Sequence, residues 1–433
     1  RSESRLSSLI TRFHSLAGAL SRARGDRETT PQSWSTGEAD MGFWNGRVTF
    51  TRYRVGGPSP LPFGEEVLEL ARKHLIGQHG AALATDGTST GWSGGDHVLD
   101  LSFDIGKNIV GDALHLAIRV DTDKVPGALL RAYTQIETEA RASLNPSGIA
   151  TKAQKQEAKE AAKARASAEA ADGRFRRLNH FPILWDGLTN TLYAGSASTN
   201  VLERLQSLFR ETFARELEPI TAGSLARGFV AGDPSNPESL QEFLGDVPLT
   251  LVAGDAGQTT SVAWSGDDPT SLDHLGNELL VWIWHTLQNQ GDAISLSDGS
   301  DVTVMLAKTL TLDCPRGQTG RDHLTDDSPA RLPEALRALQ AGKLPRKAGL
   351  ILVRQGAQYE LTLQAETLSV SGLNLPKPEE TGLSPYESRL ARLDSLRHLT
   401  QTLDLLFQAF LSRRIASNWN EEVSRIQRWL QAA

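Results

Sequence analysis

Hydrophobic and polar positions follow two different periods along the chain, and together they predict both strands and helices. Residues 43–55 (FWNGRVTFTRYRV) are rich in aromatic and β-branched side chains, which is typical of a strand. Residues 97–106 (HVLDLSFDIG) alternate cleanly between apolar and polar positions, so a strand is predicted there, with 112–121 as its partner. The segment GTSTGWSGG at 87–95 lacks such a period and is interpreted as a loop.

Helical spacing and turn signals recur through the rest of the chain. Helices are predicted at 66–78, 126–144, 150–172, 200–213, 271–290, 333–341 and in the C-terminal region from Ser384 onward. A hairpin is predicted at 180–196, and further strands at 293–313 and 348–366. Strand and helix blocks alternate irregularly, so the predicted class is α+β, with antiparallel sheets, a projecting helical arm and C-terminal helices.

Changes in composition suggest five regions. They are an amphipathic and linker extension at 1–40, an N-terminal sheet region at 41–125, the helical arm at 126–180, a central region at 181–320 with a loop-rich insertion at 222–270, and a C-terminal region at 321–433. The insertion holds one expected strand, VPLTLVAG. Residues 1–40 also suit an organelle-targeting peptide, but an accessory helix followed by a linker is favoured. The apolar ladder Leu390–Phe410 presents more apolar surface than one small sheet is expected to cover, so the C-terminal region is predicted to form a homodimer.

Composition narrows the class of protein. The chain has 433 residues, a formal net charge of -7 and 39% hydrophobic residues, which are ordinary values for a globular protein. No apolar run approaches the roughly 18–20 residues that span a bilayer. Cys314 is the single cysteine, so an intramolecular disulfide is excluded and a reducing, cytoplasmic location is expected.

Basic charge is concentrated in the stretch ATKAQKQEAKEAAKARASAEAADGRFRR, residues 150–177. Between 141 and 180 there are nine Lys or Arg against four Asp or Glu, a local charge of about +5 in an acidic protein. The predicted helix has no apolar stripe, so it is expected to project rather than to lie in a core. At helical spacing four lysines fall within an arc of about 80°: Lys152, Lys155, Lys159 and Lys163.

The residues that follow this helix add four candidates, Arg174, Phe175, Arg176 and Arg177, after a break at Gly173. A row of ammonium groups suits a polyphosphate backbone, and a Phe between arginines suits base stacking or insertion into a groove. The alternative is an ordinary solvated surface helix, which is what most Lys/Ala/Glu segments are.

The sequence offers little support for any catalytic residue. The carboxylates Asp100, Asp104, Asp121, Asp123 and those within 322–327 match no metal-binding spacing and are interpreted as surface acids. The ten histidines form no HExxH pattern, and no GxxxxGK[ST] motif occurs. His285 in VWIWHTL is interpreted as a core or rim residue. No metal, cofactor or catalytic residue is therefore predicted, and an enzyme is not expected.

The order of several motifs resembles that of the bacterial recombination-associated protein RdgC family. The motifs that carry the resemblance are GFWNGRVTFTRYRV, Gly91-Trp92, Lys124-Val125-Pro126, the Lys/Glu-rich arm with an aromatic-and-Arg tip, Trp185-Asp186, LGNELLVWIWH, GSDVTVMLAKTLTLD and EALRALQAGKL. Each motif is weak alone, but they occur in the same order over most of residues 42–415. The chain exceeds the family's usual length through its first 40 residues and the loops around 79–95 and 222–270.

The resemblance implies a half-ring protomer and a homodimer that closes into a ring around double- or single-stranded DNA. Binding would be independent of sequence, would limit access by a filament-forming recombinase, and would place the protein at the nucleoid. Phe175 matches the family's DNA-contacting aromatic, and Lys308 and Thr309 match its basic hairpin residue and polar neighbour. Two alternatives stay open: an exonuclease, which is a label given to the family, and a scaffold that binds an acidic protein through Lys152–Arg177.

Overall fold

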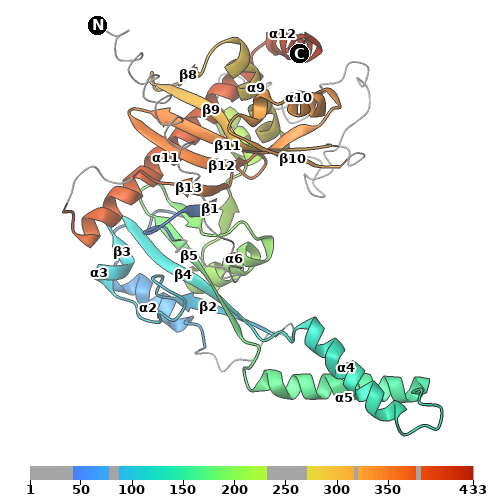
Figure 1. Ribbon diagram of the computed structural model, residues 1–433. Coiled ribbons are helices and arrows are strands. Elements are labelled where there is room, and N and C mark those ends of the chain that lie inside the picture. The colour runs from blue at the N-terminus through green and yellow to red at the C-terminus, as the bar shows by residue number, and fades with distance from the viewer. Residues whose placement is uncertain (1–41, 78–86, 232–270, 316–319, 377–381, 433) are drawn as a thin grey trace, which may run out of the picture. The chain divides into compact units, whose positions relative to one another are not determined.

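Antiparallel strands form one continuous sheet through the described part of the chain (Figure 1). The computed structural model describes residues 42–77, 87–231, 271–315, 320–376 and 382–432, all within the unit Asp40–Ala433. The strand order is β10-β9-β11-β12-β13-β1-β6-β5-β4-β2, while β3, β7 and β8 pair with β4, β1 and β9. Together with the helices this arrangement confirms the predicted α+β class.

The strands have the following bounds: β1 (Val48–Val55), β2 (Thr88–Ser93), β3 (Ile109–Val110), β4 (Ala113–Thr122), β5 (Arg177–Asp186), β6 (Thr191–Ala194), β7 (Leu217–Pro219), β8 (Ala293–Ser295), β9 (Asp301–Asp313), β10 (Asp322–Asp326), β11 (Leu344–Arg354), β12 (Ala357–Gln364) and β13 (Val370–Asn374). The helices are α2 (Glu65–Lys73), α3 (Ile105–Asn108), α4 (Gly127–Ala142), α5 (Lys152–Ala171), α6 (Thr199–Phe213), α7 (Ala222–Ala231), α9 (Leu275–Asn289), α10 (Pro333–Gln340), α11 (Pro385–Arg414) and α12 (Trp419–Ala432). Two short 3-10 turns, η1 (Leu272–His274) and η2 (Pro329–Arg331), precede α9 and α10.

Strand β1 joins the two halves of the sheet. Val48 and Phe50 pair with β13, whereas the next residues, from Thr51 to Arg54, pair with β6. The register shifts between Val48 and Phe50, as at a β-bulge, which bends a strand and increases its twist. Strand β1 therefore connects an N-terminal strand group, β2 to β7, with a C-terminal strand group, β8 to β13.

Two hydrophobic cores lie against this sheet, and β5 shows how alternation divides its side chains between them. Ile183 and Trp185 belong to the core that includes α2 and α6. Leu184, which points to the opposite face, belongs to the core that includes α7, α9, α11 and α12. Successive side chains of one strand therefore bury apolar surface against helices on both faces.

Helix α11 packs on both strand groups. It begins with the predicted capping box, in which Ser384 and Glu387 each bond to the other's backbone N–H. Arg392 donates to the carbonyl of Phe43, and His398 bonds to the hydroxyl of Tyr359 on β12. Within the predicted ladder Leu390 is half-buried, and the other members are buried within the same chain: Leu393, Leu399, Leu403, Leu406 and Phe410. Most of the apolar surface that led to the predicted dimer is therefore covered within one chain, and the dimer stays a prediction.

Three assignments made from the sequence are wrong. Residues 97–106 form no strand, but a loop followed by α3, and Leu99 and Leu101 are exposed. The segment 87–95, expected to be a loop, contains β2, and 322–327, also expected to be a loop, contains β10. The first ten residues of the predicted insertion form α7, whereas VPLTLVAG and the extension 1–40 lie outside the described residues.

None of the helices in the described residues combines the length and apolar character needed to cross a membrane.

Candidate nucleic-acid interface

The helical arm is a hairpin of α4 and α5, inserted between β4 and β5 and closed by a connection at 143–151 (Figure 1). Pro126 caps α4, as expected from its fixed φ. Helix α5 begins with a capping box in which Thr151 and Gln154 each bond to the other's backbone N–H. The predicted helix at 150–172 is thus confirmed, but it is paired with a second helix along its length.

A row of alanines holds the two helices of the hairpin together. Ala158, Ala162 and Ala166 recur every four residues along α5 and are buried. Small side chains at this spacing allow a neighbouring helix to approach closely, and in this part of α5 the neighbour is α4. The prediction that α5 has no buried stripe is therefore wrong: the stripe exists, but it consists of alanines, whose apolar signal is weak.

One side of the alanine row carries ion pairs. The hydroxyl of Tyr133 on α4 donates to Glu169 on α5 at 2.8 Å, and the guanidinium of Arg165 lies over the Tyr133 ring at 4.2 Å. Arg165 and Arg174 lie 3.5 and 3.2 Å from Glu169. The hydrogen bond with Glu169 raises the pKa of Tyr133, and the same bond lowers the pKa of Glu169. The Glu169 charge is thus shared among three partners.

A second cluster on this side lies nearer the end of the hairpin. Arg141 on α4 contacts Glu137 at 2.6 Å and reaches across to Glu157 on α5 at 3.8 Å. Glu157 and Arg165 each stand one residue before a buried alanine, which places them roughly 100° to the same side of the row. Several acidic side chains of the hairpin therefore have basic partners on this side.

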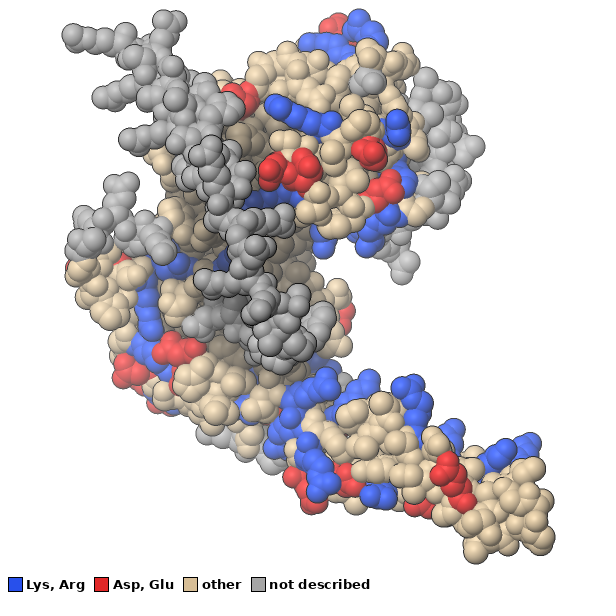
Figure 2. Space-filling view, in the orientation of Figure 1, with Lys and Arg blue, Asp and Glu red and all other residues tan. Residues whose placement is uncertain are grey.

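The lysine row lies on the other side of the alanines. Lys155, Lys159 and Lys163 each stand three residues before a buried alanine, which places them roughly 60° away from the row, opposite the ion pairs. With Lys152 they are exposed, and none has a carboxylate partner among the described residues. Figure 2 shows basic side chains along the hairpin from its base to its far end. The structure therefore separates a neutralised side from a side with free positive charge.

The four residues after α5 lie at the base of the hairpin, where β5 begins. Arg174 is paired with Glu169, and Arg176 with Asp123 at 3.0 Å, which raises the pKa of Arg176. Phe175 is half-buried, and Arg177 is exposed without a partner in the described structure. The aromatic and arginine residues that were predicted to form the tip of the arm therefore lie at its other end, next to the sheet. The end of the hairpin away from the sheet is the connection 143–151 (Figure 1).

Lys308 and Thr309 lie on β9, in the other strand group. Lys308 has a φ of 66°, which is uncommon for a residue other than glycine, and its side chain is ion-paired with Glu360. The pairing of β9 with β11 shifts register here, and a Cβ on Gly349 of β11 would lie 2.0 Å from the Ala307 carbonyl oxygen. Five strands separate β9 from β5 in the sheet order, a distance on the order of 30 Å. A single chain does not bring Lys308 to the base of the hairpin.

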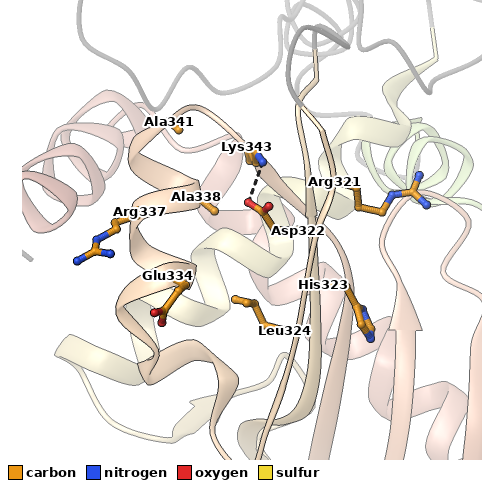
Figure 3. Close-up of a pocket in the computed structure, with 9 residues that line it drawn as sticks. All are labelled: Arg321, Asp322, His323, Leu324, Glu334, Arg337, Ala338, Ala341 and Lys343. Carbon is orange, nitrogen blue, oxygen red and sulfur yellow. Dashed lines mark hydrogen bonds and ion pairs between the residues drawn. The ribbon is translucent and has the colours of Figure 1, made fainter.

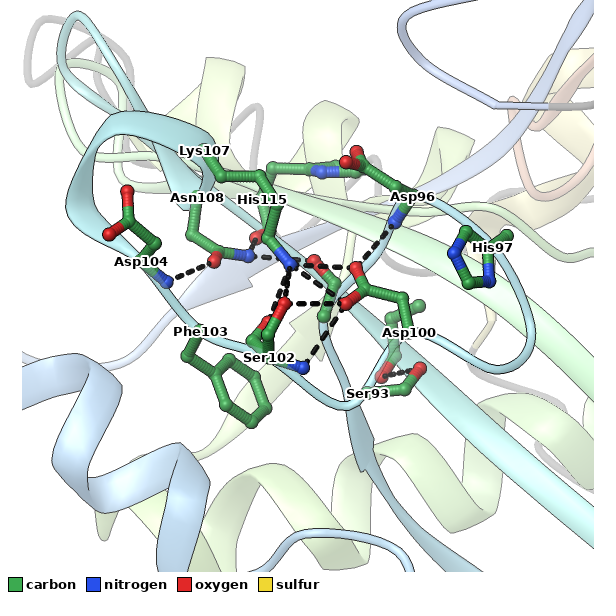
Figure 4. A network of polar contacts seen from close by, with 12 residues as sticks. Ser93, Asp96, His97, Asp100, Ser102, Phe103, Asp104, Lys107, Asn108 and His115 are labelled. Atoms are coloured by element: carbon green, nitrogen blue, oxygen red, sulfur yellow. Dashed lines mark hydrogen bonds and ion pairs between the residues drawn. The ribbon is translucent and has the colours of Figure 1, made fainter.

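Most of the carboxylates considered as metal ligands have a basic partner or accept a hydrogen bond from the backbone. Lys107 lies 2.7 Å from Asp100, and Figure 4 shows its ammonium group between Asp100 and Ser102. Burial acts to raise the pKa of Asp100, but hydrogen bonds from Lys107 and Ser102 outweigh it and lower the pKa to about 2. Asp121 is paired with Arg119, while Asp104 caps α3 by accepting from Gly106. The described ranges contain no group of three or more His, Cys, Asp or Glu arranged to hold a metal ion.

A cleft of about 450 Å³ lies between α10 and β10. It is lined by basic and acidic side chains, and Lys343 contacts Asp322 at 2.7 Å. Arg321 is paired with Asp313 outside the cleft. Figure 3 shows that Arg321 and Arg337 point away from each other. The basic groups of this cleft do not converge on one point, so it offers no anion site comparable to the lysine row.

His285 is buried beside Glu422 at 3.5 Å, which places it in the packing between α9 and α12 and agrees with its interpretation as a core or rim residue. Burial lowers the pKa of His285.

Compared with known proteins, the chain matches no family model and no curated protein. The resemblance to the RdgC family therefore stays a prediction from the order of motifs in the sequence.

Proposed function

We propose that the protein binds nucleic acid without sequence preference through the lysine row of its α4–α5 hairpin. The supporting observation is the asymmetry of the hairpin: Glu137, Glu157 and Glu169 are engaged by basic partners on one side, while four lysines on the other side are free among the described residues. Free ammonium groups along a rod attract a polyphosphate, and each phosphate they neutralise releases counterions.

The length of the lysine row suits a nucleic-acid backbone. Lys152 and Lys163 are eleven residues apart, so the row extends roughly 16 Å along α5. One strand of a duplex presents about five phosphates over that axial distance. Arg177 at the base of the hairpin extends the same charge toward the sheet, where the half-buried Phe175 could stack on a base.

The resemblance to the RdgC family extends this proposal to a dimeric ring. In that arrangement two chains encircle double- or single-stranded DNA in the cytoplasm, at the nucleoid, and limit access by a recombinase. Lys308 and Thr309 would then contact DNA from a different part of the ring, since one chain keeps them apart from the hairpin. Light scattering at micromolar concentration is expected to give twice 47.0 kDa, and a mass of 47.0 kDa would contradict the ring.

The binding experiment is fluorescence anisotropy with two labelled duplexes of unrelated sequence at physiological salt. The variant Lys152→Gln/Lys155→Gln/Lys159→Gln/Lys163→Gln is expected to bind both duplexes at least about tenfold more weakly than the unmodified chain. Glu160→Gln is the matched control, because Glu160 is exposed on the same helix and Gln156 is its one side-chain partner among the described residues. If the quadruple variant binds as well as the control, the lysine row is an ordinary solvated surface.

The same assay tests the scaffold alternative, in which the lysine row binds an acidic protein. A poly-glutamate peptide serves as the competitor. If the peptide binds the lysine row at physiological salt while neither duplex binds, the partner is an acidic protein and the nucleic-acid proposal is wrong.

A further inference from the structure

The end of the hairpin presents two apolar side chains to solvent. Leu144 is 79% exposed and Ile149 is 67% exposed, the two highest values among the exposed large hydrophobic residues of the described chain. Both lie in the connection 143–151, and Ala150, which follows directly, is buried. Exposing a Leu and an Ile in this way is unfavourable in water, so the pair is a candidate contact surface.

The turn that carries this pair is held by a side-chain network. Asn145 donates to the carbonyl of Ile149 and to the side chain of Gln154, both at 2.7 Å. Gln154 in turn accepts from the backbone N–H of Thr151 and donates back to Asn145. Gly148 has a φ of 64° and donates to the Asn145 carbonyl at 2.9 Å, which closes the turn. Leu144 and Ile149 therefore lie on either side of a turn whose backbone is held by hydrogen bonds.

The charge around the pair indicates what it contacts. No Asp or Glu occurs between residues 142 and 156, whereas Lys152 and Lys155 stand in the first turn of α5, exposed and without carboxylate partners in the described structure. Two such ends would repel each other, which disfavours a second copy of the chain as the occupant. An apolar pair beside free cations matches a base step beside its phosphates, the arrangement used by proteins that insert Leu or Ile between bases.

We propose that Leu144 and Ile149 form a wedge that inserts between bases of the nucleic acid held by the lysine row. The inference rests on the proposed function, and it adds what the hairpin does to the bound molecule. Insertion requires the bases to unstack, and unstacking costs less where pairing is already interrupted. The protein should therefore prefer a duplex with a short unpaired bubble over the same duplex fully paired.

The experiment compares two duplexes of one sequence, fully paired or with a three-nucleotide bubble, each with 2-aminopurine at its centre. The unmodified chain is expected to bind the bubble about tenfold more tightly and to raise the 2-aminopurine fluorescence. In Leu144→Ser/Ile149→Ser both effects should vanish, while affinity for the paired duplex changes less than about twofold. Ile136→Ser is the matched control, because Ile136 is 52% exposed on α4 of the same hairpin but outside the connection.

The outcomes separate the wedge from the function on which it rests. A bubble preference that persists in Leu144→Ser/Ile149→Ser overturns the wedge, as does an unmodified chain that binds both duplexes equally in a salt-dependent way. Either result leaves nucleic-acid binding through the lysines intact. A lower mass of the double variant in light scattering would assign the pair to a contact between copies. Failure of the unmodified chain to bind either duplex would overturn both proposals.

Discussion

Arg397 on α11 donates two hydrogen bonds, at 2.6 and 3.1 Å, to the carboxylate of Asp186, which is fully buried at the end of β5. Asp186 also accepts from the backbone N–H of Leu188 and from the hydroxyl of Thr189 in the turn that follows. The opposite end of β5 begins at Arg177, at the base of the hairpin. The strand that carries the hairpin is thus fixed to the longest helix of the described chain.

Removing this partner of Asp186 should destabilise the fold. In Arg397→Ala a buried carboxylate would lose its basic partner, so the free energy of unfolding is expected to fall by about 3–5 kcal/mol, measured by urea denaturation. Arg413→Ala is the matched control, since Arg413 is exposed on the same helix. Equal losses in the two variants would show that the pair contributes no more than a surface charge.

Similar contacts along α11 link this helix to both strand groups of the sheet. Asp404 is paired with Arg52 of β1 at 2.8 Å, and Thr402 accepts from Arg354 of β11. Arg414 is paired with the buried Glu278 of α9. One helix thus makes polar contacts with both strand groups and with a covering helix, which complements the apolar contacts of its leucines.

The sequence predicts local structure well where hydrophobic period and capping agree, as in α11 with its Ser384 capping box. It fails at 97–106, where strict alternation suggests a strand. There Asp100 accepts hydrogen bonds from Asp96, Ser102 and Lys107, so the backbone turns instead of extending. A single buried carboxylate overrides the pattern, and the pattern carries no sign of it.

Tertiary contact also explains why β2 looks like a loop in the sequence. Gly91 lies so close to another backbone segment of the same chain that a Cβ there would be 2.6 Å from the backbone of Ile76. Glycine is needed at this strand position because the two backbone segments approach closely. In the sequence, however, a glycine is more typical of a turn than of a strand. The pairing of β1 with both β13 and β6 is likewise a matter of sheet order, which local patterns do not contain.

The candidate site was predictable in part. Helical spacing predicts the lysine row, and the structure shows those side chains exposed. Which other cations are free depends on partners that are distant in sequence, such as Asp123, which engages Arg176 from 53 residues away. Leu144 and Ile149 were missed because two apolar residues around Asn145-Pro146 resemble the ordinary end of a helix.

Phe175 provides a test of stacking at the base of the hairpin. Phe175→Ala is expected to weaken binding to single-stranded DNA by about tenfold, and the loss should persist at high salt, because stacking is screened far less than phosphate contacts. Lys155→Ala should weaken binding mainly at low salt. Anisotropy at two salt concentrations measures both effects, and thermal unfolding confirms that each variant is folded. Identical losses at both salt concentrations for the two variants would contradict the separate roles.

His115 should make stability depend on pH. It is buried against Trp44, with no hydrogen-bond partner for either ring nitrogen in the described structure. Burial, reinforced by Arg389, lowers its pKa to about 3. An unfolded histidine titrates near 6.5, so between about pH 6.5 and 3 the unfolded chain binds a proton that the folded chain excludes. The free energy of unfolding should therefore decrease as the pH is lowered through that window, by at most about 1.4 kcal/mol per pH unit from this group.

The pH test compares the free energy of unfolding at pH 7.0 and 5.5. The loss on acidification should be smaller by about 1 kcal/mol in His115→Leu than in the unmodified chain. His97→Gln is the control, because His97 is exposed in the same region. If His115→Leu and His97→Gln lose equal stability between the two pH values, His115 can be protonated within the fold.

The strongest prediction concerns the salt dependence of binding, because it counts phosphate contacts. If the four lysines of the row each neutralise one phosphate, log affinity for duplex DNA should fall with log salt with a slope of about -3.6 per chain, and up to twice that for a dimer that engages both hairpins. Lys155→Ala/Lys159→Ala should make the slope shallower by about 2 per chain, and equally for unrelated sequences, since phosphates carry no base information. Glu160→Gln should leave the slope unchanged, and it is a better control than Glu157→Gln, which would free Arg141 from a partner 3.8 Å away. A double lysine variant with the slope of the unmodified chain would mean that these side chains contact no phosphate.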